Sequence, residues 1–292
     1  MMKRDSGRLV VFLSLSLFSL DHQAQAHPGV GIVMDARGDV YYTDLANVWR
    51  IASGGVKTIV VPRVHSHELS LDSQGRLYGE HSRYDGATER WSHRVWRLST
   101  EGMLTDIFPE REGFLKGYGF ARDAHDNLYW IDRDNEARTG AVIRKITPGG
   151  EDRPFAVTNL KQTGHLIAAS DGTLFLTDFD NLVRVGTDGS VKMVARDLGT
   201  GLAAPNIAKG RNYLMGLWLD SSNNVYVAIY ASRRVLKVEP DGEVSVAARS
   251  QAPWSPSGGL VNPSGDLWLL EFSDTNQVRV RMIAKNRAET IY

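Results

Sequence analysis

Short apolar and aromatic runs alternate with polar turns along the chain, and one such pattern recurs six times. Each copy has an apolar run, a stretch rich in Asp, Asn or Ser, a glycine-like turn residue and a second apolar-aromatic run. The copies begin at Gly31, Glu68, Gly119, His165, Gly216 and Gly258. Two β-prone runs joined by such a turn are typical of a β-hairpin. The pattern therefore predicts six hairpins.

The turn residue of each hairpin is a Gly, Asp or Asn, the residue types that best tolerate a left-handed backbone. These turn residues lie at positions 38, 75, 126, 172, 223 and 265. A third strand with the pattern Val-x-Arg/Lys-apolar, or close to it, follows each hairpin at 48–51, 95–98, 143–146, 182–185, 235–238 and 278–281. Further glycine turns then lead to a fourth strand in most units.

Six units of four strands predict an all-β fold, a six-bladed β-propeller with four antiparallel strands per blade. The segment 288–292 can supply the outer strand of the sixth blade. We therefore expect the ring to close without a strand from the N-terminus.

The first residues have a different character from the repeats. A basic start, a short apolar run at 9–20 and the small-x-small motif Ala24-Gln25-Ala26 are typical of a secretory signal peptide. We expect a signal peptide at 1–26, a single propeller at 27–292 and a periplasmic or secreted protein. No later apolar run is long enough for a membrane span.

Composition narrows the classes of function. The 292 residues carry no formal net charge and contain no basic run, which argues against nucleic acid as a partner. The chain has no Cys, which excludes disulfides, thiol catalysis and thiolate metal sites. A small-molecule substrate or ligand is the partner class that we expect.

The repeat units resemble NHL repeats and the SMP-30/gluconolactonase-like propellers, in the motif Asp-x-x-Gly-x-Val-Tyr-Tyr-Thr-Asp at 35–44 and Val-x-Arg-Ile at 48–51. The resemblance covers 27–292 and implies the fold; it also implies a lactonase, a lyase or a binding scaffold. Gluconolactonase-like members hold a divalent metal with Glu, Asn and Asp at one mouth of the channel. The matching residues here are of other types: Val30, His67, Tyr118, Gly164, Met215 and Ser257.

A dense group of imidazoles and carboxylates interrupts the second unit. His65, His67 and Glu68 precede its first strand, and Glu80 and His81 end its second strand. Because the first strand of a blade starts at the face where the second ends, these residues can meet at one mouth of the channel. His65 and His67 point to one side of the strand and Glu68 to the other, so either set can face the channel.

Two chemistries remain open for this group. Imidazole and carboxylate suit a divalent metal such as Zn, Cu, Mn or Fe(II), with Ca as a further candidate; its predicted ligands are His65, His67 and His165, which lies in the fourth blade where the second has Glu68. Without a metal, a His–Glu pair can act as general acid and base. In either case the predicted catalytic residues are Glu68, Glu80 and His81.

Further residues near the same mouth are predicted to bind substrate: Tyr118, Arg133, Trp254 and Glu271. Glu271 occupies the position of His81, where three other blades carry Asp44, Asp132 and Asp178, whose recurrence indicates a structural hydrogen bond. Two functions follow. The first is an exported hydrolase or lyase of a lactone or ester, and the alternative is a non-catalytic propeller that binds a ligand or partner protein.

Overall fold

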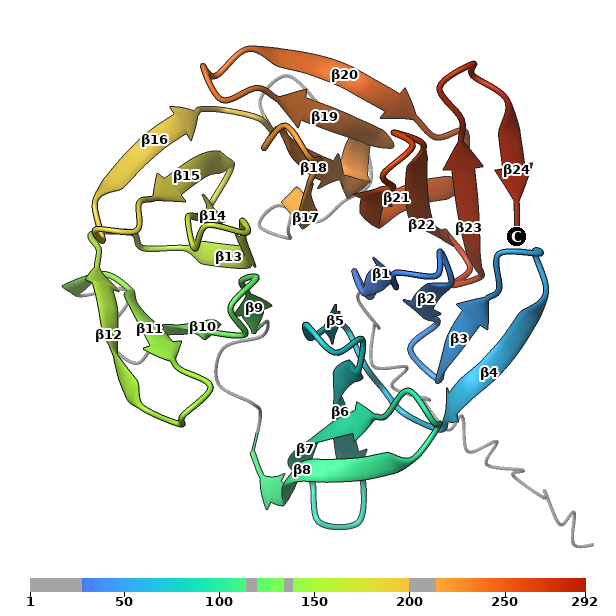
Figure 1. The fold of residues 1–292 in the computed structure, drawn as a ribbon, viewed down its shortest axis with the longest axis horizontal. Coiled ribbons are helices and arrows are strands. Elements are labelled where there is room, and N and C mark those ends of the chain that lie inside the picture. The colour runs from blue at the N-terminus through green and yellow to red at the C-terminus, as the bar shows by residue number, and fades with distance from the viewer. Residues whose placement is uncertain (1–27, 114–119, 134–138, 200–213) are drawn as a thin grey trace, which may run out of the picture.

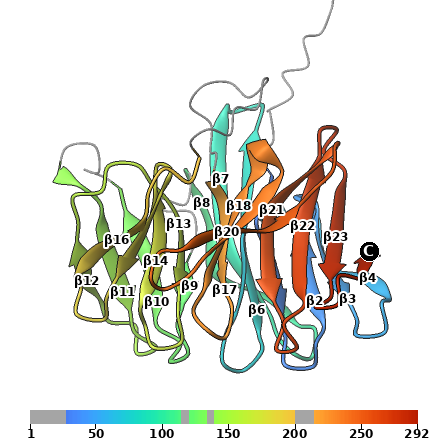
Figure 2. The same cartoon turned by 90° about the horizontal axis from the view of Figure 1, so that it is seen from above.

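The computed structural model describes residues 28–113, 120–133, 139–199 and 214–292. These residues form six four-stranded antiparallel sheets arranged as blades around a central axis (Figure 1). Seen from the side, the blades stand next to one another with their strand ends at the two faces of the ring (Figure 2). The predicted six-bladed β-propeller is therefore confirmed.

The strands follow in chain order, four to a blade, with the first strand of each blade nearest the axis (Figure 1). The first three blades comprise β1 (Ile32–Met34), β2 (Val40–Thr43), β3 (Asn47–Ile51), β4 (Lys57–Pro62); β5 (Leu69–Leu71), β6 (Leu77–Asp85), β7 (Arg90–Leu98), β8 (Leu104–Glu112); and β9 (Ala121–Arg122), β10 (Leu128–Asp132), β11 (Val142–Ile146), β12 (Asp152–Val157). The last three comprise β13 (Thr163–Ala168), β14 (Leu174–Asp178), β15 (Asn181–Val185), β16 (Val191–Ala195); β17 (Leu214–Leu219), β18 (Val225–Ile229), β19 (Arg234–Val238), β20 (Val244–Arg249); and β21 (Trp254–Val261), β22 (Leu267–Ser273), β23 (Val278–Ile283), β24 (Glu289–Ile291). A short 3₁₀ helix, η1 (Tyr230–Ser232), follows β18.

All six predicted hairpin turns adopt the left-handed backbone that their residue types suggested. Their φ values lie between 60° and 87° at Gly38, Gly75, Asp126, Gly172, Asn223 and Gly265. An Asp side chain folds back over four of these turns and accepts backbone N–H groups two and four residues later. The turns thus satisfy their own backbone donors locally, which is why the repeat is visible in the sequence.

The apolar core lies between the blades. Separate clusters of buried side chains join blades one and two, three and four, four and five, five and six, and six and one. The indole of Trp96 in β7, for example, is fully buried in the cluster between blades one and two. At these five junctions the face of one sheet is therefore covered by its neighbour, and burial depends on the blades packing side by side.

The sixth blade completes itself. Its outer strand β24 pairs antiparallel with β23, as the sequence predicted, and β1 lies beside β21. The described part of the chain contains no helix with the length and hydropathy needed to traverse a bilayer. The predicted signal peptide lies outside the described residues and stays a prediction.

Candidate functional site

The first residues of the six sequence repeats define a ring at one end of the channel. Its described members, which we call the glycine ring, are Gly31, Glu68, His165, Gly216 and Gly258. A Cβ atom on Gly31 would lie 2.9 Å from the Leu69 nitrogen, and one on Gly216 would lie 2.7 Å from the Ser257 oxygen. These glycines let neighbouring inner segments pack backbone against backbone. Glu68 and His165 are the two described members with side chains.

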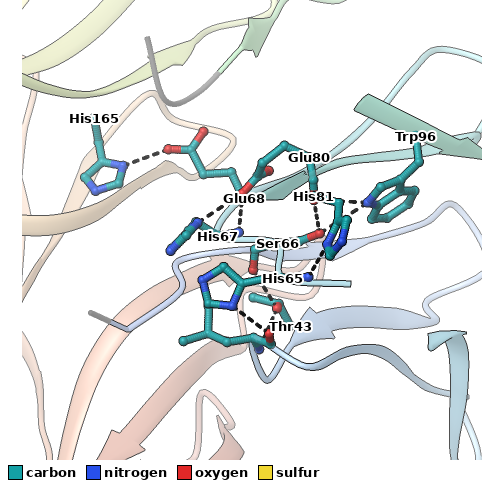
Figure 3. A network of polar contacts seen from close by, with 10 residues as sticks. Thr43, His65, Ser66, His67, Glu68, Glu80, His81, Trp96 and His165 are labelled. Carbon is teal, nitrogen blue, oxygen red and sulfur yellow. Dashed lines mark hydrogen bonds and ion pairs between the residues drawn. The ribbon is translucent and has the colours of Figure 1, made fainter. Parts of the chain in front are cut away.

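Glu68 and His165 meet across the ring. Glu68 directly precedes β5, His165 lies in β13, and the Glu68 Oε1 atom is 3.1 Å from Nδ1 of His165 (Figure 3). Each side chain is 23% exposed, and both line an open cavity of about 390 Å³ formed by residues of the inner strands. The structure therefore turns Glu68 toward the channel, which the sequence had left open.

Glu80 supports the segment that carries Glu68. Its carboxylate accepts the backbone N–H of His67 and lies 3.3 Å from the His67 Nδ1 atom (Figure 3). Its carbonyl oxygen accepts hydrogen bonds from the Ser66 hydroxyl and from the Trp96 indole, the latter at 3.1 Å. Glu80 is buried and does not line the cavity. These contacts give Glu80 a positioning role rather than contact with a substrate.

His65 and His81 are also engaged with the protein itself. The His65 backbone N–H donates to Nδ1 of His81 at 2.8 Å, and Nδ1 of His65 lies 2.9 Å from the Leu45 carbonyl oxygen. Burial lowers the pKa of His81, and the Arg94 guanidinium lowers it further. A neutral ring accepts the hydrogen bond at Nδ1, which agrees with this direction. Neither His65 nor His81 lines the cavity.

The three predicted metal ligands do not come together. The rings of His65 and His67 make an edge contact with centroids 4.7 Å apart, whereas His165 bonds to Glu68. Among the described residues, no three His, Asp or Glu side chains are placed to hold a metal. None of the positions that match the gluconolactonase metal ligands carries a carboxylate; Val30 and Ser257 are two of these positions. The described residues do not fit that metal site, so we derive no step through a metal.

Arg133, a predicted substrate-binding residue, instead supports the strand that carries His165. Its Nε atom donates to the Thr163 hydroxyl at 3.2 Å, and its Nη2 atom donates to the Gly164 carbonyl oxygen at 3.0 Å. Arg133 does not line the cavity. Tyr118, another predicted substrate-binding residue, lies outside the described residues.

Glu271 and Trp254, also predicted to bind substrate, are placed away from the channel lining. Glu271 is completely buried, where it pairs with Arg279 at 2.6 Å and Arg281 at 3.0 Å and accepts the Ser250 hydroxyl. The Arg279 guanidinium stacks over the Trp254 ring at 4.3 Å. These contacts make a closed structural network in blade six and correct the expectation that Glu271 faces a ligand.

The predicted structural role of the recurring Asp is confirmed where its contacts are described. Asp44 accepts the Ala46 N–H at 2.8 Å, and Asp178 accepts the N–H groups of Lys161 and Gln162 at 3.1 and 2.9 Å. Among the charged residues of the cavity wall, sequence reasoning missed one, Arg122 in β9. Its signal was available, because the other repeats carry an apolar residue at that position.

Comparisons of the sequence find no family description and no curated protein that matches. The fold has many solved counterparts. A catalytically inactive histidine-to-alanine variant of virginiamycin B lyase from Staphylococcus aureus, with quinupristin, is 14% identical and has a TM-score of 0.57. The alignment covers 92% of this chain and 85% of that one.

Two further solved structures have the same fold. The calcium-binding protein regucalcin from Agrobacterium tumefaciens is 15% identical, covers 83% of this chain and 81% of its own, and has a TM-score of 0.56. A gluconolactonase from Xanthomonas campestris is 12% identical, covers 87% and 81%, and has a TM-score of 0.55. The chain therefore shares the six-bladed propeller fold of the gluconolactonase-like proteins and virginiamycin B lyase, as its repeats predicted.

Proposed function

We propose that this protein is an enzyme that opens a lactone or ester bond in a small molecule. Glu68 and His165 are its acid–base pair. The observation that carries the proposal is their 3.1 Å contact on the wall of the central cavity. A carboxylate that orients an imidazole and stabilises its charged form is the arrangement that general acid–base catalysis requires.

The pair can carry out either of two reactions. With Nδ1 of His165 held by Glu68, the Nε2 atom is the one that takes a proton from the reactants. In hydrolysis, it takes the proton from a water molecule that attacks the carbonyl carbon, and the C–O bond of the ester then breaks. In elimination, it takes the proton from the carbon next to a carbonyl, a double bond forms to the neighbouring carbon, and the C–O bond at that carbon breaks to release a carboxylate. The imidazolium then gives the proton to the leaving alkoxide in hydrolysis and to the released carboxylate in elimination.

The fold counterparts support this class of chemistry. A gluconolactonase opens a cyclic ester, and virginiamycin B lyase is described as inactive after one histidine is replaced by alanine. The predicted signal peptide supports an exported enzyme that acts in the periplasm or outside the cell. The proposed mechanism uses side chains of the chain alone, because the described residues do not fit a metal site.

The experiment is a turnover screen of the full chain against simple lactones, aryl esters and quinupristin, the compound in the virginiamycin B lyase structure. Mass spectrometry separates the reactions, because hydrolysis adds one water and elimination leaves the mass of an opened ring unchanged. Glu68→Gln and His165→Asn should each lower kcat/KM roughly 10²- to 10⁴-fold. Glu101→Gln, an exposed Glu, and His93→Asn, whose ring bonds to the Gly113 carbonyl, are the matched controls.

Full turnover in both Glu68→Gln and His165→Asn would contradict the proposed pair. Binding of a screened compound without any conversion would instead favour the non-catalytic propeller, the alternative function that the sequence left open.

A further inference from the structure

A second ring of equivalent residues surrounds the channel on the other side of the cavity. Each member pairs with the first residue of the second strand of its own blade, so the six positions are equivalent by register. We call this set the apolar ring: Met34, Leu71, Arg122, Ala168, Leu219 and Val261. Five members are apolar and one is a cation. An arginine among apolar residues on the wall of a cavity needs a polar or charged group that accepts its hydrogen bonds.

The protein satisfies this arginine only in part. The Arg122 guanidinium lies over the Tyr78 ring at 4.7 Å, and its Nη1 atom forms an ion pair with Oδ1 of Asp126 at 3.7 Å, a distance too long for a hydrogen bond. The Asp126 carboxylate instead accepts the N–H and the hydroxyl of Ser73, at 3.0 and 2.5 Å. Nε of Arg122 is buried, and no described residue accepts a hydrogen bond from it.

This arrangement leaves the Nη groups of the guanidinium, rather than the buried Nε atom, available to a ligand on the cavity wall. The Arg122 side chain is 12% exposed and lines the same cavity as Glu68 and His165. A guanidinium in such surroundings is matched best by a carboxylate, which it can bind through two parallel hydrogen bonds. Tyr78 and Asp126 hold the guanidinium in place, which lowers the entropic cost of binding.

The position of Arg122 also fixes how a ligand lies. Arg122 is level with Leu71, and Leu71 is three residues along the inner strand from Glu68, about 10 Å by strand geometry. The wall between the two levels includes apolar residues of four blades: Ile32, Leu69, Ile167 and Leu217. The Glu68 carboxylate repels an anion, so a bound acid places its carboxylate at Arg122 and its other end at the Glu68–His165 pair.

We propose that Arg122 binds the carboxylate of a small organic acid whose apolar body lies along the channel toward Glu68 and His165. The cavity of about 390 Å³ is large enough for such a ligand. The proposal makes small organic acids the substrate class of the proposed enzyme. It rests on the proposed function only in placing the end of the ligand that reacts at Glu68 and His165. Recognition of the acid is independent of turnover.

The test is a binding comparison on the full chain with 4-phenylbutyrate and its uncharged analogue 4-phenylbutyramide. Isothermal calorimetry gives the affinity, and a change in the Trp fluorescence of the chain, to which Trp218 on the cavity wall contributes, is a second measure of binding. The acid should bind roughly 10- to 100-fold more tightly than the amide, since a hydrogen-bonded charge is worth about 1.5–3 kcal/mol. Arg122→Gln should weaken the acid to the level of the amide.

Arg144→Gln is the matched control. Arg144 also lies over an aromatic ring, Trp130 at 5.8 Å, and pairs with an aspartate, Asp152 at 2.9 Å, but it does not line the cavity. This variant should keep the wild-type preference for the acid. Arg122→Lys keeps the charge without the fork and should retain part of that preference. The comparison of acid with amide on the wild type needs no variant and stands even where one fails to fold.

Several results would overturn the proposal. The first is equal affinity for the acid and the amide. The second is the absence of saturable binding by phenylbutyrate and by its shorter and longer homologues. The third is an equal loss of affinity for the acid in Arg144→Gln and Arg122→Gln. Inorganic phosphate competing as well as the organic acid would mark a simple anion site and would also overturn it. Glu68→Gln and His165→Asn should keep acid binding while losing turnover, which separates failure of this proposal from failure of the proposed function.

Discussion

At the scale of single residues, neighbouring polar side chains at one channel mouth have different roles, which depend on their burial and hydrogen bonds. Glu68 keeps partial exposure and a single imidazole partner, whereas Glu80 is buried and bound to the backbone N–H of His67. His81 lies half-buried on the side away from the cavity and accepts the His65 N–H. The same residue types therefore give the proposed acid–base pair in one place and a structural support in another.

His81 gives a prediction for pH. Burial is the main cause that lowers its pKa from the ordinary value of 6.5, and nearby charges act in both directions: Arg94 and Arg83 lower it, Glu110 and Glu80 raise it. As pH falls below 6.5, the unfolded chain takes up a proton that the folded chain does not. The free energy of unfolding should therefore decrease with falling pH until the folded pKa is reached, and then level off.

Urea unfolding between neutral and mildly acidic pH measures this contribution as the difference between the wild type and His81→Asn. Asn can still accept the His65 N–H but cannot titrate, so the variant should lose this part of the pH dependence. Titration of the ring by NMR gives the pKa directly. A ring pKa of 6.5 or above would contradict the prediction.

At the scale of elements, the hairpin turn is a unit that stabilises itself. In blade three, Asp123 accepts the N–H groups of His125 and Asn127 at 2.9 and 3.0 Å and the Tyr129 hydroxyl at 3.0 Å. Burial opposes the charge on Asp123, but the hydrogen bonds, led by those from Asn127, keep its pKa below the ordinary range. A tyrosine hydroxyl six residues after the Asp makes the same contact in blades one, two and five.

Asp123→Ala should destabilise the protein by about 1–3 kcal/mol, because it leaves the Tyr129 hydroxyl and two backbone N–H groups without an acceptor. Asp241→Ala removes one backbone contact in an exposed turn and should cost much less. Chemical denaturation of both variants at neutral pH is the measurement. Equal losses in the two variants would show that the buried hydroxyl adds nothing.

At the scale of the whole molecule, the glycine ring links closure of the propeller to the candidate site. A Cβ atom on Gly258 would overlap the Val30 carbonyl oxygen, at the junction where blade six meets blade one. The backbone N–H of Val30 in turn donates to the His67 carbonyl oxygen at 2.7 Å, next to Glu68. The same close packing that closes the ring therefore sets the position of the proposed catalytic residue.

Gly258→Ala should lower the free energy of unfolding by about 1–3 kcal/mol, as overpacking of a close-packed region does. It should also lower turnover of any substrate found in the screen, since it displaces the inner segments. Gly54→Ala is the matched control, because a Cβ atom there meets nothing within 4 Å. Thermal unfolding and kcat/KM measure both effects. A fully stable Gly258→Ala protein would mean that the junction can relax.

The sequence alone determined the architecture: the number of blades, the left-handed turn residues and the final strand β24. These features depend on hydrogen bonds and side-chain alternation within a few residues, so each repeat contains its own evidence. It also placed Glu68 and His165 at equivalent positions, but it grouped His165 with His65 and His67. Glu271 was also assigned the wrong partners, because the sequence pattern did not show that its side chain pairs with Arg279 and Arg281 on the adjacent strand.

Only the tertiary structure decided which side chains meet. Glu68 and His165 are 97 residues apart and come from different blades, so their contact exists only in the closed ring. Strand alternation could not tell whether Glu68 or the pair His65 and His67 faces the channel, because both choices obey the same period of two. The orientation of Glu68 is fixed by the hydrogen bonds of the His67 backbone to blade one and to Glu80. Both are contacts between segments that are distant in the sequence.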